Sequence, residues 1–157
     1  MAEVRIDDNV LVEAPASVVW QVVKDPAAHA QWHPFVTTIS GEHHLGATRT
    51  CAVSLGKKRG QTRERCVVDD NERRIAWAVE EDSSGFLRLV KNWTAGFQLE
   101  ARDGASTQVT AESVFEPRNP LVRLMIPMVR GKFHGAQRAI LAGLKAAAEG
   151  QTPRSSA

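Results

Sequence analysis

The chain has 157 residues, of which 43% are hydrophobic and 24% are charged, and its formal net charge is +2. This length fits one domain with a sizeable core, and the composition excludes disordered, collagen-like and coiled-coil proteins. The near balance of charge gives no reason to expect nucleic acid as a partner.

The first part of the chain predicts one strand followed by two short helices. Hydrophobic residues alternate over 4–13, which is typical of a strand. Pro15 then opens a helix, since proline is tolerated in a first turn, and the helix stops at Pro26. A short second helix must end near His33, because Pro34 disfavours helical backbone in the residue before it.

From Phe35 onward the hydrophobic pattern has a period of two, interrupted at short intervals by turn signals. We expect antiparallel strands joined by hairpins. The expected strands are 48–55, 61–68, 74–80, 87–101 and 107–115. The glycine-bounded segment 56–60 is expected to form the first hairpin turn.

The last part of the chain, 121–149, predicts one long amphipathic helix, because hydrophobic residues recur at steps of three and four. Pro127 should kink this helix or divide it into a short lead-in and a main helix. The fold class is therefore α+β, with a curved antiparallel sheet of about six to seven strands wrapped around the long helix. We expect a single domain over 1–149 and a flexible polar tail over 150–157.

Several short motifs follow one another in a distinctive order. They are Ala14 to Trp20, Trp32-His33-Pro34-Phe35, Gly46 to Arg49, Thr62 to Arg65, Thr107 to Thr110 and Phe115-Glu116-Pro117. This order, closed by the long helix, resembles the polyketide cyclase/dehydrase and lipid-transport group of the START-like (Bet v 1-like, SRPBCC) superfamily. The resemblance covers about residues 3–149. It implies a helix-grip fold with a deep cavity between the sheet and the C-terminal helix, in proteins that include cyclases, lipid carriers, hormone receptors and chaperone activators.

The strand faces predict such a cavity independently. Arg63 and Arg65 face water, which places Glu64 on the other face, toward the long helix. The side chains expected to point inward mix large and small residues, and a mostly apolar pocket follows. The candidate ligand-binding residues are Trp32, Phe35, Cys51, Val53, Cys66, Trp77, Val79, Asn92, Ala111, Ser113, Met125, Met128, Val129 and Phe133. The alternative is that helix side chains such as Met125, Met128 and Phe133 fill this space as ordinary core.

Glu64 and His33 are the candidate catalytic residues. Among apolar side chains the charged form of Glu64 is disfavoured, which would suit it to general acid/base work. The alternative is that it pairs with a neighbouring arginine. His33 lies at the pocket entrance that the resemblance implies and could shuttle a proton or bond a ligand oxygen, whereas the alternative is a loop histidine capping a backbone carbonyl.

Other polar groups give weaker signals. Asn92 and Trp93 interrupt an apolar strand, and one of them should face the cavity unless a bulge near Gly96 shifts the alternation. Cys51 and Cys66 lie symmetrically about the first hairpin, and we expect two buried, inert thiols. Along the long helix a basic stripe recurs at four-residue steps and is expected to be its solvated face. The stripe consists of Arg130, His134 and Arg138.

We expect neither a metal nor a cofactor. His29 and His33 have the spacing of zinc ligands, but Pro34 takes His33 out of the helix and no third ligand is suitably placed. No Gly-rich phosphate-binding loop or dinucleotide fingerprint is present. No apolar stretch approaches the ~20 residues that cross a bilayer, and no secretory signal is visible, so we expect a cytoplasmic protein without stable membrane insertion.

Two functions fit these observations. The first is a cyclase or dehydratase in which Glu64, helped by His33, moves a proton during ring closure or loss of water from a polyketide-like substrate. Cyclases of the resembled group often line their pockets with tyrosine and arginine, and the absence of tyrosine from this chain counts against that function. The second is a non-enzymatic carrier of a lipid or metabolite, or a protein-interaction module. We expect a monomer or homodimer that binds a hydrophobic small molecule.

Overall fold

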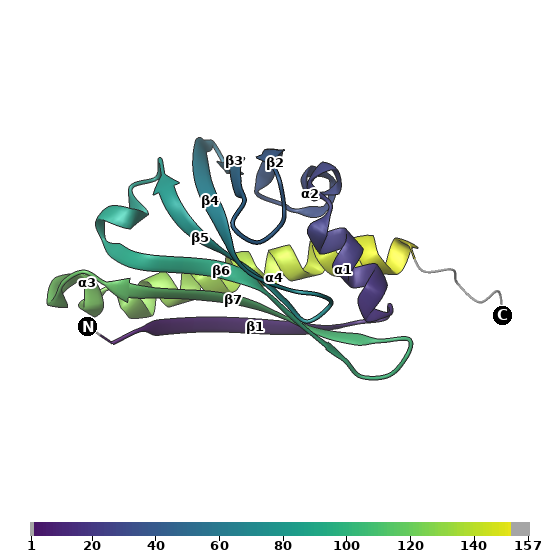
Figure 1. Cartoon of the computed structure of the whole chain (residues 1–157). Coiled ribbons are helices and arrows are strands. Elements are labelled where there is room, and N and C mark those ends of the chain that lie inside the picture. Colours follow the sequence, from purple (N-terminus) through teal and green to yellow (C-terminus); the bar gives the residue numbers. More distant parts are fainter. Residues whose placement is uncertain (1, 152–157) are drawn as a thin grey trace.

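The computed structural model describes residues 2–151, which form one curved antiparallel sheet and four helices. In chain order the elements are β1 (Val4–Val12), α1 (Ala16–Lys24), α2 (Pro26–Trp32), β2 (Val36–Gly41), β3 (Thr48–Leu55), β4 (Lys58–Asp70), β5 (Arg74–Asp82), the 3-10 turn η1 (Phe86–Arg88), β6 (Val90–Ala101), β7 (Thr107–Pro117), α3 (Pro120–Leu124) and α4 (Ile126–Gln151). The seven strands lie in the order β1-β7-β6-β5-β4-β3-β2. The sheet bends around α4, while α1 and α2 close one end (Figure 1). This is the helix-grip fold that the sequence predicts.

The short helices begin and end where their sequence predicts. Backbone N–H groups of Val18 and Val19 donate to the carbonyl of Pro15 and start α1. The side chain of Asp25 accepts from the backbone N–H of Ala27 and caps α2. That helix ends at His33, whose backbone is extended, as a residue before proline requires. These caps fix the place where the chain turns back toward the sheet.

The expected long helix is divided at Met125 into α3 and α4. Pro127 lies in the first turn of α4, where its missing N–H leaves no helical bond unmade. Helix α4 continues through Gly150 and Gln151, two residues that we expected in the tail. The rest of that expectation, 152–157, lies outside the described residues.

Two hydrophobic clusters lie between the sheet and the helices. The larger one joins α1, α2 and the C-terminal half of α4 to the sheet and contains Trp20, Trp32, Trp77, Phe97, Leu141 and Leu144 among others. The smaller one lies near α3 and contains Val4, Ile6, Val90, Phe115, Val122 and Ile126, with Phe86, Trp93, Val129 and Phe133 packed against it. Within residues 2–151 no helix is both long and apolar enough to cross a bilayer.

Candidate ligand-binding site

A cavity of about 200 Å³ lies between the concave face of the sheet and α4. Its walls combine residues of both hydrophobic clusters with a few polar groups. The lining residues are His29, His33, Val36, Arg49, Cys51, Val53, Thr62, Glu64, Trp77, Trp93, Ala95, Gly96, Phe97, Ala111, Glu112, Ser113, Gln137 and Ile140. The composition is that of a small-molecule site, although the volume is below the ~300–1,000 Å³ of most ligand pockets.

Seven of the predicted site residues line this cavity. They are His33, Cys51, Val53, Glu64, Trp77, Ala111 and Ser113. Cys66 on β4 and Val79 on β5 are also buried, but they do not line the cavity. Trp32 belongs to the larger hydrophobic cluster, and its indole N–H donates to the carbonyl of Val22. Phe35 lies beside His33, with ring centroids 6.0 Å apart.

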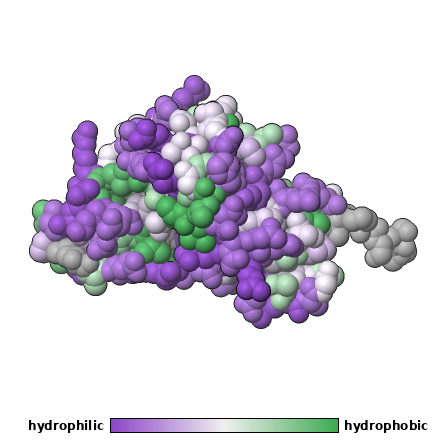
Figure 2. Space-filling view, in the orientation of Figure 1, coloured by the Kyte–Doolittle hydropathy of each residue, from purple (hydrophilic) through white to green (hydrophobic). Residues whose placement is uncertain are grey.

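The predicted residues at the start of the long helix lie elsewhere. Met125 and Met128 are exposed, because the break between α3 and α4 turns them outward. Val129 and Phe133 pack into the smaller hydrophobic cluster and fill space as core, the alternative considered above. On the face shown in Figure 2, hydrophobic surface lies in the half of the molecule that carries η1 and α3 and extends to its middle.

Asn92 points away from the cavity and Trp93 takes the inward position. Asn92 has a positive φ of 54°, and the pairing of β6 with β7 shifts register between Lys91 and Thr94. The side chain of Asn92 is exposed and donates to Glu116. A bulge at Asn92 and Trp93 therefore exchanges the two faces, three to four residues before the position considered near Gly96.

An ion pair between Arg49 and Glu64 forms the polar end of the cavity. Arg49 donates from Nε and Nη2 to one carboxylate oxygen of Glu64, at 2.9 and 2.7 Å. The other oxygen accepts from the hydroxyl of Thr62 at 2.9 Å. The guanidinium also lies 3.5 Å from the ring centroid of Trp77, a cation–π contact. Glu64 is therefore paired with an arginine, which is the alternative given for this residue in the sequence analysis, and it is not a free acid or base.

Three histidines surround this ion pair, and all are neutral at physiological pH. Burial, helped by the positive charge of Arg49, lowers the pKa of His29 to about 2 and that of His33 and His43 to about 4. Nδ1 of His33 accepts from the backbone N–H of Phe35 at 3.1 Å, so the ring proton is on Nε2. Nε2 of His43 in turn accepts from Arg49 at 3.3 Å.

The lowered pKa values of these histidines predict that the protein loses stability in mild acid. Their pKa in the folded state is below the ordinary 6.5, so the unfolded chain binds more protons between pH 6.5 and about 4. The free energy of unfolding should be constant above pH 6.5 and should fall below it, by about 1.4 kcal/mol per pH unit for each histidine. Urea unfolding between pH 7.5 and 4.5 measures this slope. His43→Gln should reduce it and exposed His44→Gln should not; a flat wild-type profile would contradict the argument.

A second polar group enters the cavity from α4. The hydroxyl of Ser113 donates to the amide oxygen of Gln137 at 2.8 Å, and the amide nitrogen of Gln137 donates to Asp8 on β1, also at 2.8 Å. Asp8 is in contact with His134 and Arg138 as well. Burial opposes its charge, but these partners outweigh it and lower the pKa of Asp8. The basic stripe of α4 therefore contacts β1, while the side chain of Arg138 remains 73% exposed to solvent.

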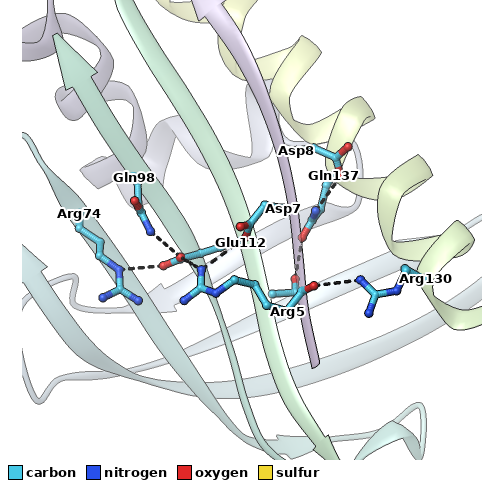
Figure 3. A network of polar contacts seen from close by, with 9 residues as sticks. Arg5, Asp7, Asp8, Arg74, Gln98, Glu112, Arg130 and Gln137 are labelled. Atoms are coloured by element: carbon cyan, nitrogen blue, oxygen red, sulfur yellow. Dashed lines mark hydrogen bonds and ion pairs between the residues drawn. The ribbon is translucent and has the colours of Figure 1, made fainter. Parts of the chain in front are cut away.

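The carboxylate of Glu112 lies on the outer face of the sheet, although Glu112 is among the residues that line the cavity. Its carboxylate accepts from Arg5, Arg74 and Gln98 (Figure 3). Burial disfavours the charge, but these donors outweigh it and lower the pKa of Glu112. A larger hollow of about 730 Å³ beside it is lined mainly by polar side chains of β5, β6 and β7 and contains no predicted site residue.

The cysteines are separate buried thiols. Cys51 pairs with Thr62 across β3 and β4, and Cys66 pairs with Trp77, so the two cysteines are not cross-strand neighbours. Burial, followed by the charge of Glu64, raises the pKa of Cys51 to about 11. Residues 2–151 contain no group of three or more His, Cys, Asp or Glu side chains arranged to hold a metal ion.

Sequence reasoning did not single out Arg49, His43 or Gln137 as site residues, and it left open which of Asn92 and Trp93 faces the cavity. Arg49 stands two residues before Cys51, so strand alternation already placed it on the inner face. Trp93 depended on the bulge. His43 and Gln137 carry no local signal, because their partners come from distant segments.

The structure defines a helix-grip protein with a cavity between the sheet and α4. Residues 3–149 match the family described as "Polyketide cyclase / dehydrase and lipid transport". The chain therefore belongs to this family, the one that the sequence motifs resemble. A search of curated protein sequences found no match.

Solved structures with the same fold share little sequence with this chain. The ZhuI aromatase/cyclase from a Streptomyces species has a TM-score of 0.75 at 20% identity, over 94% of both chains. A START superfamily protein from Mycobacterium smegmatis has a TM-score of 0.78 at 16% identity, covering 94% of this chain and 99% of the other. Norcoclaurine synthase from Thalictrum flavum, solved with dopamine and hydroxybenzaldehyde, has a TM-score of 0.75 at 14% identity, covering 98% and 90%. At these identities the likeness concerns the fold alone.

Proposed function

We propose that this protein binds a small, mostly apolar molecule in the cavity between the sheet and α4. The observation that carries the proposal is the space itself, left between two packed hydrophobic clusters and lined by Trp77, Trp93 and Phe97 together with a few hydrogen-bonded polar groups. Family membership supports it, as does the neighbour solved with two aromatic ligands.

The volume limits the ligand. A cavity of ~150 Å³ lined by apolar side chains holds benzene, so about 200 Å³ suits one ring with a short substituent. A long acyl chain or a polyketide of several rings would require α4 or the segment from Trp32 to Phe35 to move. A ring-sized ligand is the simplest occupant of this cavity.

Cyclisation or dehydration by proton transfer is the second candidate, since Glu64 and His33 line the same space. Two features weaken it. Both oxygens of Glu64 already accept hydrogen bonds, from Arg49 and Thr62. The pKa of His33, lowered to about 4 by burial and Arg49, makes it a weak base at neutral pH. Binding without turnover is therefore the function proposed first.

Acetophenone, a neutral one-ring probe, tests the proposal. Its addition should shift the NMR signals of the indole N–H groups of Trp77 and Trp93, which line the cavity. Ala111→Leu should weaken binding tenfold or more, because the added methyl groups enter the same space. Ala101→Leu, at the exposed end of β6, is the matched control. Absence of shifts in the wild type at saturating probe would sink the proposal, and a changed mass of the recovered probe would favour the enzyme.

A further inference from the structure

We propose that Glu64 sets the charge selectivity of the cavity, so that it accepts an uncharged ring-sized molecule with an acceptor oxygen and excludes carboxylates. This inference rests on the proposed function and narrows the class of ligand. It assigns Glu64 a role in specificity in place of proton transfer.

The first step is the balance of charge in the cavity wall. Among the lining residues within 2–151, three carry a formal charge: Arg49, Glu64 and Glu112. The carboxylate of Glu112 lies on the outer face of the sheet with Arg5 and Arg74 (Figure 3). Arg49 and Glu64 remain, and they neutralise each other through two hydrogen bonds to one oxygen. The cavity therefore has no uncompensated charge.

The second step is the state of the histidines that adjoin this pair. His29 and His33 line the cavity, and His43 accepts from Arg49 behind it. All three are neutral at physiological pH, so none provides a positive charge for an anion. A ligand carboxylate would have to shed its water in a cavity that offers it no uncompensated positive charge, which is unfavourable.

The third step is the kind of hydrogen bond that the cavity offers. Because Nδ1 of His33 accepts from Phe35, the ring of this cavity-lining residue carries its proton on Nε2, which is a donor. The hydroxyl proton of Ser113 is already committed to Gln137. A neutral donor in an apolar cavity suits a carbonyl, ether or hydroxyl oxygen.

The test compares acetophenone with benzoate at pH 7.5, two probes that share a ring and differ in charge. The wild type should bind acetophenone at least tenfold more tightly, measured by the indole N–H shifts of Trp77 and Trp93. In Glu64→Gln the order should reverse, because Arg49 is left as a buried charge without a partner. Glu80→Gln removes the carboxylate from the exposed Arg65–Glu80 pair on the outer face and should keep the wild-type order.

Each outcome bears on a different claim. Benzoate binding the wild type as tightly as acetophenone would overturn the inference and leave the proposed function standing, whereas binding of neither probe would overturn both. The double variant Arg49→Gln/Glu64→Gln has no buried charge at this position, so it avoids the folding cost of an unpaired arginine. It should prefer acetophenone; a preference for benzoate there would show that another group controls selectivity.

Discussion

Replacing Arg49 with methionine should lower the free energy of unfolding by about 3–5 kcal/mol. The substitution leaves the Glu64 carboxylate, whose side chain is only 14% exposed, without its positive partner. It also removes the guanidinium from the face of Trp77. Urea unfolding at pH 7.5 measures the loss.

The outer face of the same sheet offers a matched control. Arg65 pairs with Glu80 between β4 and β5, but the two side chains are 48% and 31% exposed. Arg65→Met should therefore cost less than about 1 kcal/mol. In the double variant Arg49→Met/Glu64→Gln no unpaired charge remains, and much of the lost stability should return. Equal losses in Arg49→Met and Arg65→Met would contradict the importance of burial for this pair.

Gly143→Ala should destabilise the fold by about 1–3 kcal/mol. A Cβ at this position would overlap the backbone carbonyl oxygen of Trp32, where the end of α2 approaches α4. The helix can accommodate it only by moving away from α2, at a cost greater than the gain in helix propensity. Thermal unfolding gives the stability difference.

The same helix provides the opposite expectation for a second glycine. A Cβ at Gly135 would meet nothing within 4 Å, and the residue is exposed. Gly135→Ala should therefore stabilise the protein by about 0.5–1 kcal/mol, because alanine is the better helix former. If Gly143→Ala also stabilised the protein, the close approach of the two helices would not exist in solution.

The Gly143 contact matters for the site as well as for stability. Trp32 is followed by His33, which lines the cavity, and Pro34 also lies near Gly143. Displacing the end of α2 would move His33 relative to the ion pair of Arg49 and Glu64. Binding of acetophenone should accordingly weaken in Gly143→Ala and remain unchanged in Gly135→Ala.

Strand alternation predicts the inward position of several residues of the cavity wall. Cys51, Glu64, Trp77 and Ser113 line the cavity as expected from their inward position. This success has a local cause, because successive side chains of a strand point to opposite faces whatever the rest of the chain does. Arg49 obeys the same rule two residues from Cys51, and its inward position was available from the sequence.

Alternation failed where the backbone left its regular period. The positive φ of Asn92 belongs to a bulge that turned this residue outward and Trp93 inward. The break at Met125 likewise rotated Met125 and Met128 out of the face that a continuous helix would bury. Helical period alone placed Arg130 among solvated residues, although it donates to the backbone of Arg5 on β1.

By itself the sequence determined the order of most elements, the ends of the two short helices, the two faces of most strands and the family, because each depends on neighbours within a few residues. Only the tertiary structure decided the chemistry of the cavity. It paired Glu64 with Arg49, removed the charge from the histidines through burial and joined Ser113 to Asp8 through Gln137. The reason is physical: the charge state of a polar side chain follows from its burial and partners, and Asp8 and Gln137 lie 129 residues apart in the chain.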